Sequence, residues 1–340
     1  MQVHDLRQTK AFLVLVLGAV LLLLVWRTQG NSKLVVYCAH DSVFAEAILR
    51  DFEKREGVPI EVKFDTEATK SLGLVERIIR EKDHPQCDVF WNNELLGTLD
   101  LAQRGLLKEH KGKGWERTPP QWRDDEGLWA GFGGRMRMKI VNTSRTDHAE
   151  PTAGAASHFA FAKPLYGTTL SHFTALWNLW GPEKTKRWHT DVRSAGVQIA
   201  NGNAAVRDLV ANGAAGAGWT DTDDYFDAKD QGRPVLAVPA ELDGGQTICI
   251  PNTVAIMKDA NRGDLARMLV DHLLSARTEL ALAKSKARQI PLGPLTPEQT
   301  AGLPEEVSQL IPVAAKSVDQ KGMLKARNEC LDWLKAEYLK

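Results

Sequence analysis

The sequence has no excess of charge of either sign. Lys and Arg together number 43, as do Asp and Glu, so the formal net charge of the 340-residue chain is zero. Proteins that bind nucleic acids usually show a clear basic excess, so we expect no nucleic-acid partner. Internal repeats and low-complexity tracts are also lacking. A chain of 340 residues is too long for one ordinary core, which predicts two domains.

Motifs of common enzyme classes are missing too. We find no G-x-S-x-G, no H-E-x-x-H and no glycine-rich dinucleotide fingerprint. We therefore expect a protein that is not an enzyme; the rival is a metal-dependent hydrolase that uses His40 and an aspartate cluster. The four cysteines form no C-x-x-C pair: Cys38, Cys87, Cys249 and Cys330. Their even number permits disulfides in an exported chain, but three lie in apolar strand-like runs, which favours buried free thiols.

One long hydrophobic run lies near the N-terminus. Residues 11–26 are all apolar, with Arg7 and Lys10 before them and Arg27 after them. This pattern is typical of an export signal, and at about 1.5 Å per residue the run nearly spans a hydrocarbon core of about 30 Å. No A-x-A cleavage sequence follows, which favours an uncleaved inner-membrane anchor over a cleaved signal. We assign residues 1–32 to this segment and expect the remaining chain outside the cytoplasm, in the periplasm.

Apolar runs of strand length alternate with amphipathic helical patterns in the first third of the chain. Strands are predicted at 34–39, 59–64 and 87–91, and helices at 43–56, 68–81 and 95–101. This order is typical of a parallel, doubly wound α/β sheet. Polar residues follow each strand: His40 and Asp41, then Thr66, then Asn92 and Asn93. Because open α/β sheets bind ligands at the carboxyl ends of their strands, these residues predict one edge of a cleft.

The rest of the chain continues the alternation around two long strands. These are predicted at 127–142 and 246–257, with shorter strands at 159–165, 196–200 and 234–238 and a C-terminal helix at 318–339. We interpret the long strands as crossings between two α/β lobes, each with a doubly wound sheet. The first lobe comprises residues 33–131 and 250–290, the second residues 132–249, and residues 291–340 form a helical segment packed on both. Such clamshells bind a small ligand between lobes that close by a hinge motion.

Further polar residues follow strands or begin helices in the second lobe. Gly167-Thr168-Thr169 begins a helix, and Asn203 begins another. Free backbone N–H groups and hydroxyls at such positions suit an anion, although simple N-capping is the alternative. Arg135, beside two glycines, could face the cleft and hold an anion. We interpret Arg137 as a solvent-facing strand residue.

The densest polar cluster follows a strand that ends at Trp219. It reads Thr220-Asp221-Thr222-Asp223-Asp224-Tyr225. Carboxylates, hydroxyls and a phenol just past a strand end predict a ligand site. The alternative is that Asp223 or Asp224 caps the next helix and that the others are solvated.

Several stretches together resemble one family of transport proteins. They are LVVYCAHD, QCDVFWNNELLGTLDLAQRGLL, WAGFGGRMRMKIVNTS, KPLYGTTLSHFTALWNLWG, NGNAAVRDLVANGAAGAGWTDTDDY and CIPNTVAIMKDA. In order and spacing they are similar to the extracellular solute-binding proteins of ABC importers, in the ferric-iron-binding, bacterial transferrin-like family. The resemblance covers most of residues 34–294. It implies a monomeric protein with a two-lobed clamshell fold like that of the type II periplasmic binding proteins. Such a protein would deliver a small ligand to a membrane permease.

The resemblance carries over only part of the family's metal site. Iron-binding members hold Fe³⁺ with two adjacent tyrosines, and that pair falls here on Asp223 and Asp224, with Tyr225 beside them. His40 matches a histidine ligand of the family, and Asn93 stands where some members have a carboxylate. The family's synergistic anion, carbonate or phosphate, is implied at Gly167-Thr168-Thr169 and Asn203.

Two ligand classes therefore fit the sequence. Our leading interpretation is ferric iron or an iron-anion complex, because carboxylates are hard oxygen ligands. The predicted metal ligands are His40, Asp223, Asp224 and Tyr225. The alternative is an organophosphonate or phosphate-type anion without iron, whose ammonium group would pair with the aspartates. A membrane-tethered sensor with the same clamshell is a third possibility. The residues predicted to contact the ligand are His40, Asp41, Thr66, Asn92, Asn93, Arg135, Gly167, Thr168, Thr169, Asn203, Asp221, Thr222 and Asp223.

Overall fold

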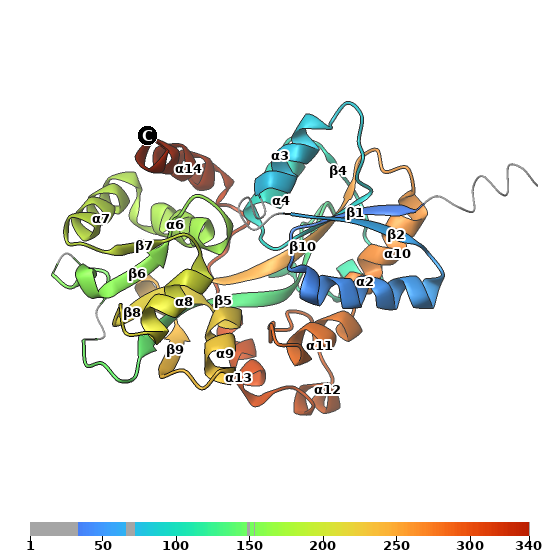
Figure 1. Ribbon diagram of the computed structural model, residues 1–340. Coiled ribbons are helices and arrows are strands. Elements are labelled where there is room, and N and C mark those ends of the chain that lie inside the picture. Colours follow the sequence, from blue (N-terminus) through green and yellow to red (C-terminus); the bar gives the residue numbers. More distant parts are fainter. Residues whose placement is uncertain (1–32, 66–71, 148–149, 153, 340) are drawn as a thin grey trace, which may run out of the picture.

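The protein is a two-lobed α/β clamshell (Figure 1). The computed structural model describes residues 33–65, 72–147, 150–152 and 154–339. The predicted N-terminal anchor at 11–26 and the predicted site residue Thr66 lie outside these ranges. Within them, no helix is long and apolar enough to cross a membrane.

The first lobe contains the parallel strands predicted from the early apolar runs. They are β1 (Leu34–Cys38), β2 (Ile60–Phe64) and β3 (Val89–Asn92), in the order β2-β1-β3. Helices α2 (Ser42–Glu56), α3 (Leu72–Arg80) and α4 (Leu96–Gln103) follow these strands in turn, and α10 (Gly263–Leu273) and α11 (Ala276–Lys284) come from a later part of the chain. β1, in the middle of these three strands, is apolar throughout because both faces of the sheet are covered there, whereas the edge strand β2 carries Glu61 and Lys63.

The second lobe repeats the arrangement with β6 (Phe159–Ala162), β7 (Gln198–Ala200) and β8 (Ala217–Asp221). Parallel pairing gives the order β8-β6-β7. Its helices are α6 (Gly167–Trp180), α7 (Pro182–Ser194), α8 (Asn203–Ala211) and α9 (Thr222–Asp230). One boundary differs from the sequence prediction, because β8 continues two residues past Trp219. Helix α6 begins at Gly167, whose φ of +59° suits glycine.

Two long antiparallel strands join the lobes, as predicted. They are β5 (Ala130–Asn142) and β10 (Cys249–Met257). β10 also pairs with β3 and with β4 (Leu107–Lys108), while β5 pairs with β8 and with β9 (Val235–Pro239). The β5–β10 register shifts between Pro251 and Asn252. At this irregularity the Asn252 side-chain amide donates to the carbonyl oxygen of Phe132 at 3.3 Å. The domain boundaries stay predictions.

The remaining elements cover the lobes and their junction. They are α5 (Lys113–Arg117), α12 (Pro297–Ala301), α13 (Glu305–Ala314), α14 (Leu324–Tyr338) and the short 3₁₀ helices η1 (Pro120–Trp122), η2 (Ala156–His158) and η3 (Asp243–Gly245). The segment after residue 290 contains helices α12, α13 and α14 despite its prolines. Pro297 lies in the first turn of α12, where a missing N–H costs nothing, and Pro312 lies near the end of α13.

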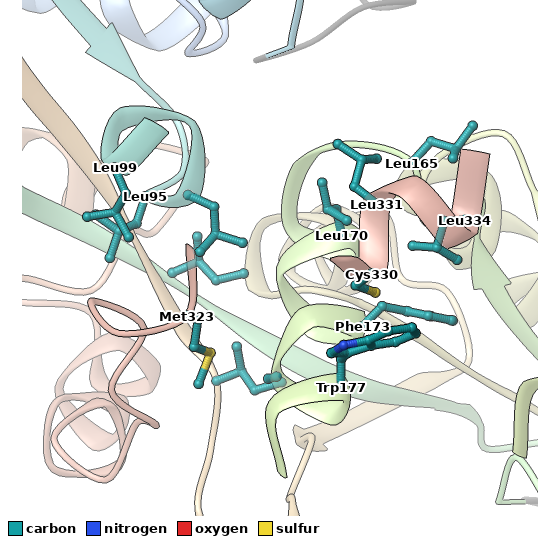
Figure 2. Close-up of a cluster of buried hydrophobic side chains, with 14 of the residues drawn as sticks. Leu95, Leu99, Leu165, Leu170, Phe173, Trp177, Met323, Cys330, Leu331 and Leu334 are labelled. Carbon is teal, nitrogen blue, oxygen red and sulfur yellow. The ribbon is translucent and has the colours of Figure 1, made fainter. Parts of the chain in front are cut away.

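A buried hydrophobic cluster runs under α14 and reaches both lobes. It includes Leu95 just before α4, Leu99 of α4, Phe173 and Trp177 of α6, and Leu331 of α14 (Figure 2). All four cysteines are buried and free, which confirms the prediction of structural thiols. Burial raises the pKa of the Cys249 thiol to about 12, so it stays protonated at neutral pH.

Candidate functional site

A cavity of about 560 Å³ lies where the strand ends of the two lobes face each other. Its first-lobe lining includes His40, Asp41, Asp65 and Asn93. Its other lining residues include Arg135, Lys163, Tyr166, Gly167, Thr168, Thr169, Asn203, Asp221, Asp223 and Asp224. The structure thus brings together most of the residues that the sequence placed at strand ends. The cause is the parallel topology, which puts the carboxyl ends of β1, β3, β6 and β8 on the two facing edges.

Four helices begin at the border of this cavity. The first residues of α2, α6 and α8 line it, as do Asp223 and Asp224 in the first turn of α9. None of the four N-cap residues, Asp41, Tyr166, Gly202 and Asp221, makes a side-chain capping hydrogen bond. The first N–H groups of a helix have no partner within the helix, and the helix dipole makes this end positive. The cavity is therefore bordered by backbone donors that side chains do not cap. This result argues against simple N-capping by Thr168 or Thr169.

A buried ion pair lies beneath the α6 and α8 helix starts. Arg137 Nη1 lies 2.6 Å from Asp221 Oδ1, and both side chains are at most 3% exposed. The other Asp221 oxygen accepts from the Thr168 hydroxyl at 2.5 Å and from the Asn203 amide at 2.9 Å. Thr169 donates in turn to Asn203 Oδ1 at 3.1 Å. This network fixes the hydroxyls and amide of two helix starts relative to the end of β8.

Our interpretation of Arg137 as solvent-facing was wrong, because its side chain is fully buried. The alternation of side chains along a β-strand would have placed Arg137 correctly. Residues two apart on a strand share a face, so Arg135 and Arg137 of β5 must point the same way. The Nε and Nη2 atoms of Arg137 have no hydrogen-bond partner among the residues that the structure describes.

Arg135 connects the cavity to the first lobe. Its Nη2 donates to the carbonyl oxygen of Asn93 at 2.5 Å, and its Nη1 lies 3.8 Å from Asp223 Oδ2. The side chain is only 5% exposed, so this positive charge acts in a poorly solvated environment where electrostatic interactions are strong. Arg135 is thus placed between the backbone of one lobe and the acidic cluster of the other.

Three carboxylates form the acidic cluster. Ligand atoms of Asp221, Asp223 and Asp224 lie within 4.8 Å of one another. Burial is the main cause that raises the pKa of Asp223, to which Asp221 adds and which Arg135 opposes. Burial also raises the pKa of Asp224, and repulsion by Asp223 and Asp221 raises it further. Asp223 and Asp224 therefore hold protons more tightly than isolated aspartates do.

His40 lines the cavity at the end of β1, but its ring is largely packed. It is 3% exposed and lies 5.4 Å from the Trp91 ring and 5.9 Å from the Phe44 ring, centroid to centroid. Its Nε2 is 3.3 Å from the Gln289 amide nitrogen. Contacts with the two aromatic rings and with Gln289 thus fix the orientation of the His40 ring at the cavity wall.

Three predicted site residues do not line the cavity. The Asn92 side chain is fully buried and donates to Glu94 and Thr98. The Thr222 hydroxyl accepts from the Met136 backbone at 3.3 Å. Tyr225, the predicted phenolate ligand, lies in the core of the second lobe, with its ring 5.3 Å from that of Phe226. Helix periodicity explains this position, because Asp223 and Asp224 face the cavity and the next side chain turns towards the sheet.

Several lining residues were missed, among them Lys163 and Tyr166. Both follow the end of β6, so the strand-end rule applied to His40 and Asn93 would also have found them. The Tyr166 hydroxyl donates to the carbonyl oxygen of Asn201 at 3.1 Å. Tyr166 is the one tyrosine that lines the cavity among the described residues.

Comparison with known proteins assigns the chain to a family. A profile of the family described as bacterial extracellular solute-binding protein matches residues 34–285. The chain belongs to this family. It is a solute-binding protein and not an enzyme, in agreement with the motifs that the sequence lacks.

Individual relatives of this solute-binding protein are distant in sequence. An uncharacterized protein of Haemophilus influenzae is 25% identical over 281 residues, which cover 77% of this chain and 79% of the relative. Iron-bound HitA from Pseudomonas aeruginosa is 19% identical with a TM-score of 0.75, covering 90% of this chain and 99% of HitA. The periplasmic binding protein AfuA from Actinobacillus pleuropneumoniae, with exogenous fructose-6-phosphate bound, is 20% identical with a TM-score of 0.70, covering 90% and 98%. These structures confirm the type II clamshell.

The buried pair predicts a large loss of stability when its cation is removed. Replacing Arg137 by Met leaves Asp221 buried without its cation and should lower the free energy of unfolding by about 3–5 kcal/mol. The double variant Arg137→Met/Asp221→Asn should recover about 1–2 kcal/mol, since no charge is then left unpaired. Urea unfolding at neutral pH measures both. Arg277→Met, which breaks an exposed Arg–Asp pair, is the control and should cost less than about 1 kcal/mol. A similar cost for Arg137 and Arg277 would contradict the assigned role.

The raised pKa of Asp224 predicts a pH-dependent stability. Between the ordinary carboxyl pKa and the raised value, the folded protein binds more protons than the unfolded chain, so stability should fall as pH rises through this window. In Asp224→Asn this contribution is absent. Between about pH 5 and about pH 8 the wild type should therefore lose at least about 1 kcal/mol more than the variant in urea unfolding. The exposed Glu241→Gln control should follow the wild type. Parallel curves for the wild type and Asp224→Asn would refute the assignment.

Proposed function

We propose that this protein is the substrate-binding component of an ABC importer and that its solute is an organic anion with a phosphate or phosphonate group. Membership of the extracellular solute-binding family supports a transport role outside the cytoplasm. The apolar run at 11–26 supports export, followed by anchoring to the inner membrane if it is not cleaved. The partners are then the solute and a membrane permease.

The observation that carries the ligand proposal is the convergence of uncapped helix starts on one cavity. At α6 and α8, backbone N–H groups and helix dipoles face the cavity, and the hydrogen bond from Thr169 to Asn203 holds the two helix starts beside each other. A tetrahedral oxyanion is the ligand that such donors suit best. Arg135, 5% exposed at the same cavity, adds a positive charge.

The other side of the cavity favours a ligand with an organic part. The volume of about 560 Å³ is in the range of sites for small organic molecules and far exceeds one phosphate ion. Carboxylates at Asp41 and Asp65 of the first lobe line this part of the cavity, and Asp223 of the second lobe lies close to Asp221. Such groups accept hydrogen bonds from hydroxyls or an ammonium, and they repel an anion. A phosphorylated polyol or an aminophosphonate would present its anion to the helix starts and its donors to these acids.

Ferric iron, alone or with an anion, is the second candidate, and the acidic cluster supports it. Three carboxylates within 4.8 Å supply hard oxygen ligands. Among similar folds, HitA is described as iron-bound, and a Trichodesmium protein as a complex with iron and citrate. Against it, Asp221 already bonds Arg137, Thr168 and Asn203, and Tyr225 lies in the core. We therefore rank iron below the organic anion, which reverses the order favoured by the sequence.

Thermal unfolding and calorimetric titration with four probes test the proposal. The probes are fructose 6-phosphate, 2-aminoethylphosphonate, inorganic phosphate and ferric citrate. At about a hundredfold excess over Kd, a ligand that binds only the folded state adds about 2.7 kcal/mol of stability. At least one of the two organic probes should stabilise the protein more than inorganic phosphate does. Stabilisation by ferric citrate alone would support iron instead.

A substitution at the helix start checks where the solute binds. Thr169→Val removes one hydroxyl at nearly constant volume and should weaken binding of the organic probe about tenfold, which is about 1.4 kcal/mol. Thr190→Val, on the exposed face of α7, is the matched control and should leave the affinity unchanged. Equal affinities of Thr169→Val and wild type would place the anion elsewhere.

A further inference from the structure

The C-terminal helix α14 lies across the boundary between the two lobes. It packs along α6 of the second lobe and also touches α4 of the first (Figures 1 and 2). Its role is not explained by the solute cavity, since none of its residues lines that cavity. Its contacts with the second lobe differ from its contacts with the first lobe.

Contacts with the second lobe are extensive and hold α14 firmly. The Trp333 ring lies 5.4 Å from that of Trp177, centroid to centroid. Near the end of α14, the Tyr338 hydroxyl is 2.7 Å from His189 Nε2. Glu329 accepts from the indole of Trp177 at 3.4 Å. Because these contacts fix the helix to α6 and α7, α14 moves with the second lobe.

Towards the first lobe, α14 presents one buried cation. Arg327 is 8% exposed, and its Nη1 lies 3.9 Å from Asp100 Oδ2 on α4. Glu94, just before α4, lines the same narrow crevice as Arg327; burial raises the pKa of its carboxyl, and the positive charge of Arg327 opposes this rise. Arg327 Nη1 donates to Asn328 Oδ1 on its own helix at 2.9 Å, and its Nε is buried without a hydrogen-bond partner among the described residues. The attraction between Arg327 and Asp100 thus acts beside the apolar cluster that α14 shares with Leu99 of α4, at a distance longer than a hydrogen bond.

The surroundings of Arg327 connect it to the solute cavity. It borders a narrow crevice with Glu94 and Gly97 of the first lobe and with Tyr166 and Gly167 of the second. Tyr166 and Gly167 also line the solute cavity. Glu94 directly follows Asn93, whose carbonyl oxygen accepts from Arg135. A movement of the lobes that changes the width of this crevice therefore also changes the width of the solute cavity.

We propose that Arg327 is an electrostatic latch, which holds the lobes together through Asp100 and Glu94 whether or not a solute is bound. Attraction between charges in a poorly solvated crevice weakens as their separation increases. Closure by hinge motion brings Arg327 to the two acids, and opening takes it away from them. The latch sets the fraction of molecules with closely approached lobes and so the apparent affinity for the solute.

Distance measurement between the lobes tests the latch without any solute. Spin labels at Ala47→Cys on α2 and Ala205→Cys on α8 report the width of the cavity mouth by pulsed electron resonance; both positions are exposed, and the four native thiols are buried. Arg327→Met should increase the long-distance fraction about fivefold over the parent. Asp100→Asn, which keeps the side-chain shape, should shift the distribution in the same direction.

Two control variants separate the latch from general effects. Lys325→Met replaces a cation that is 90% exposed on the same helix, and Arg104→Met removes the other partner of Asp100. Both should keep the parental distribution. If Arg327→Met does not fold, the comparison of Asp100→Asn with the same controls tests the latch. The latch would be overturned if Asp100→Asn, and Arg327→Met where it folds, kept the parental distances. It would also be overturned if the control variants shifted the distances equally. Because no solute is present, this result leaves the proposed function untouched.

Discussion

The buried Arg137–Asp221 pair is the interaction on which the site depends. It joins the shared strand β5 to the end of β8, and its carboxylate orients Thr168 of α6 and Asn203 of α8. A buried pair of this kind is costly to desolvate, and two groups, the Thr168 hydroxyl and the Asn203 amide, form hydrogen bonds with both ions. The contacts that bond the ions therefore also hold the two helix starts in place.

Periodicity and topology made most of the fold predictable. The apolar run of β1 and the alternation around it indicated a parallel sheet, and strand ends such as His40 and Asn93 then indicated the cavity. The failures have physical causes. Charge alone suggested an exposed Arg137, although its strand register with Arg135 makes it inward-facing. The rotation of α9 that buries Tyr225 depends on where the helix begins, which local sequence signals fix poorly.

Proteins with this fold bind different ligands. Solved structures with the same clamshell are described with iron, with iron and citrate, or with fructose 6-phosphate, at 17–20% identity. In this chain an acidic pair, Asp223 and Asp224, lines the same cavity as the uncapped starts of α6 and α8. Burial raises the pKa of both acids, which reduces the negative charge that an incoming anion meets. In this account, one cavity thus combines donors for an anion with acceptors for the rest of the solute.

The most direct measurement is an elemental competition. The protein is equilibrated with ferric citrate, fructose 6-phosphate and 2-aminoethylphosphonate together, freed of unbound solutes, and analysed for phosphorus and iron by plasma mass spectrometry. The account predicts about one phosphorus atom per chain and no stoichiometric iron, because the helix starts bind the oxyanion. About one iron atom per chain without phosphorus would contradict it and would make the three aspartates a metal site.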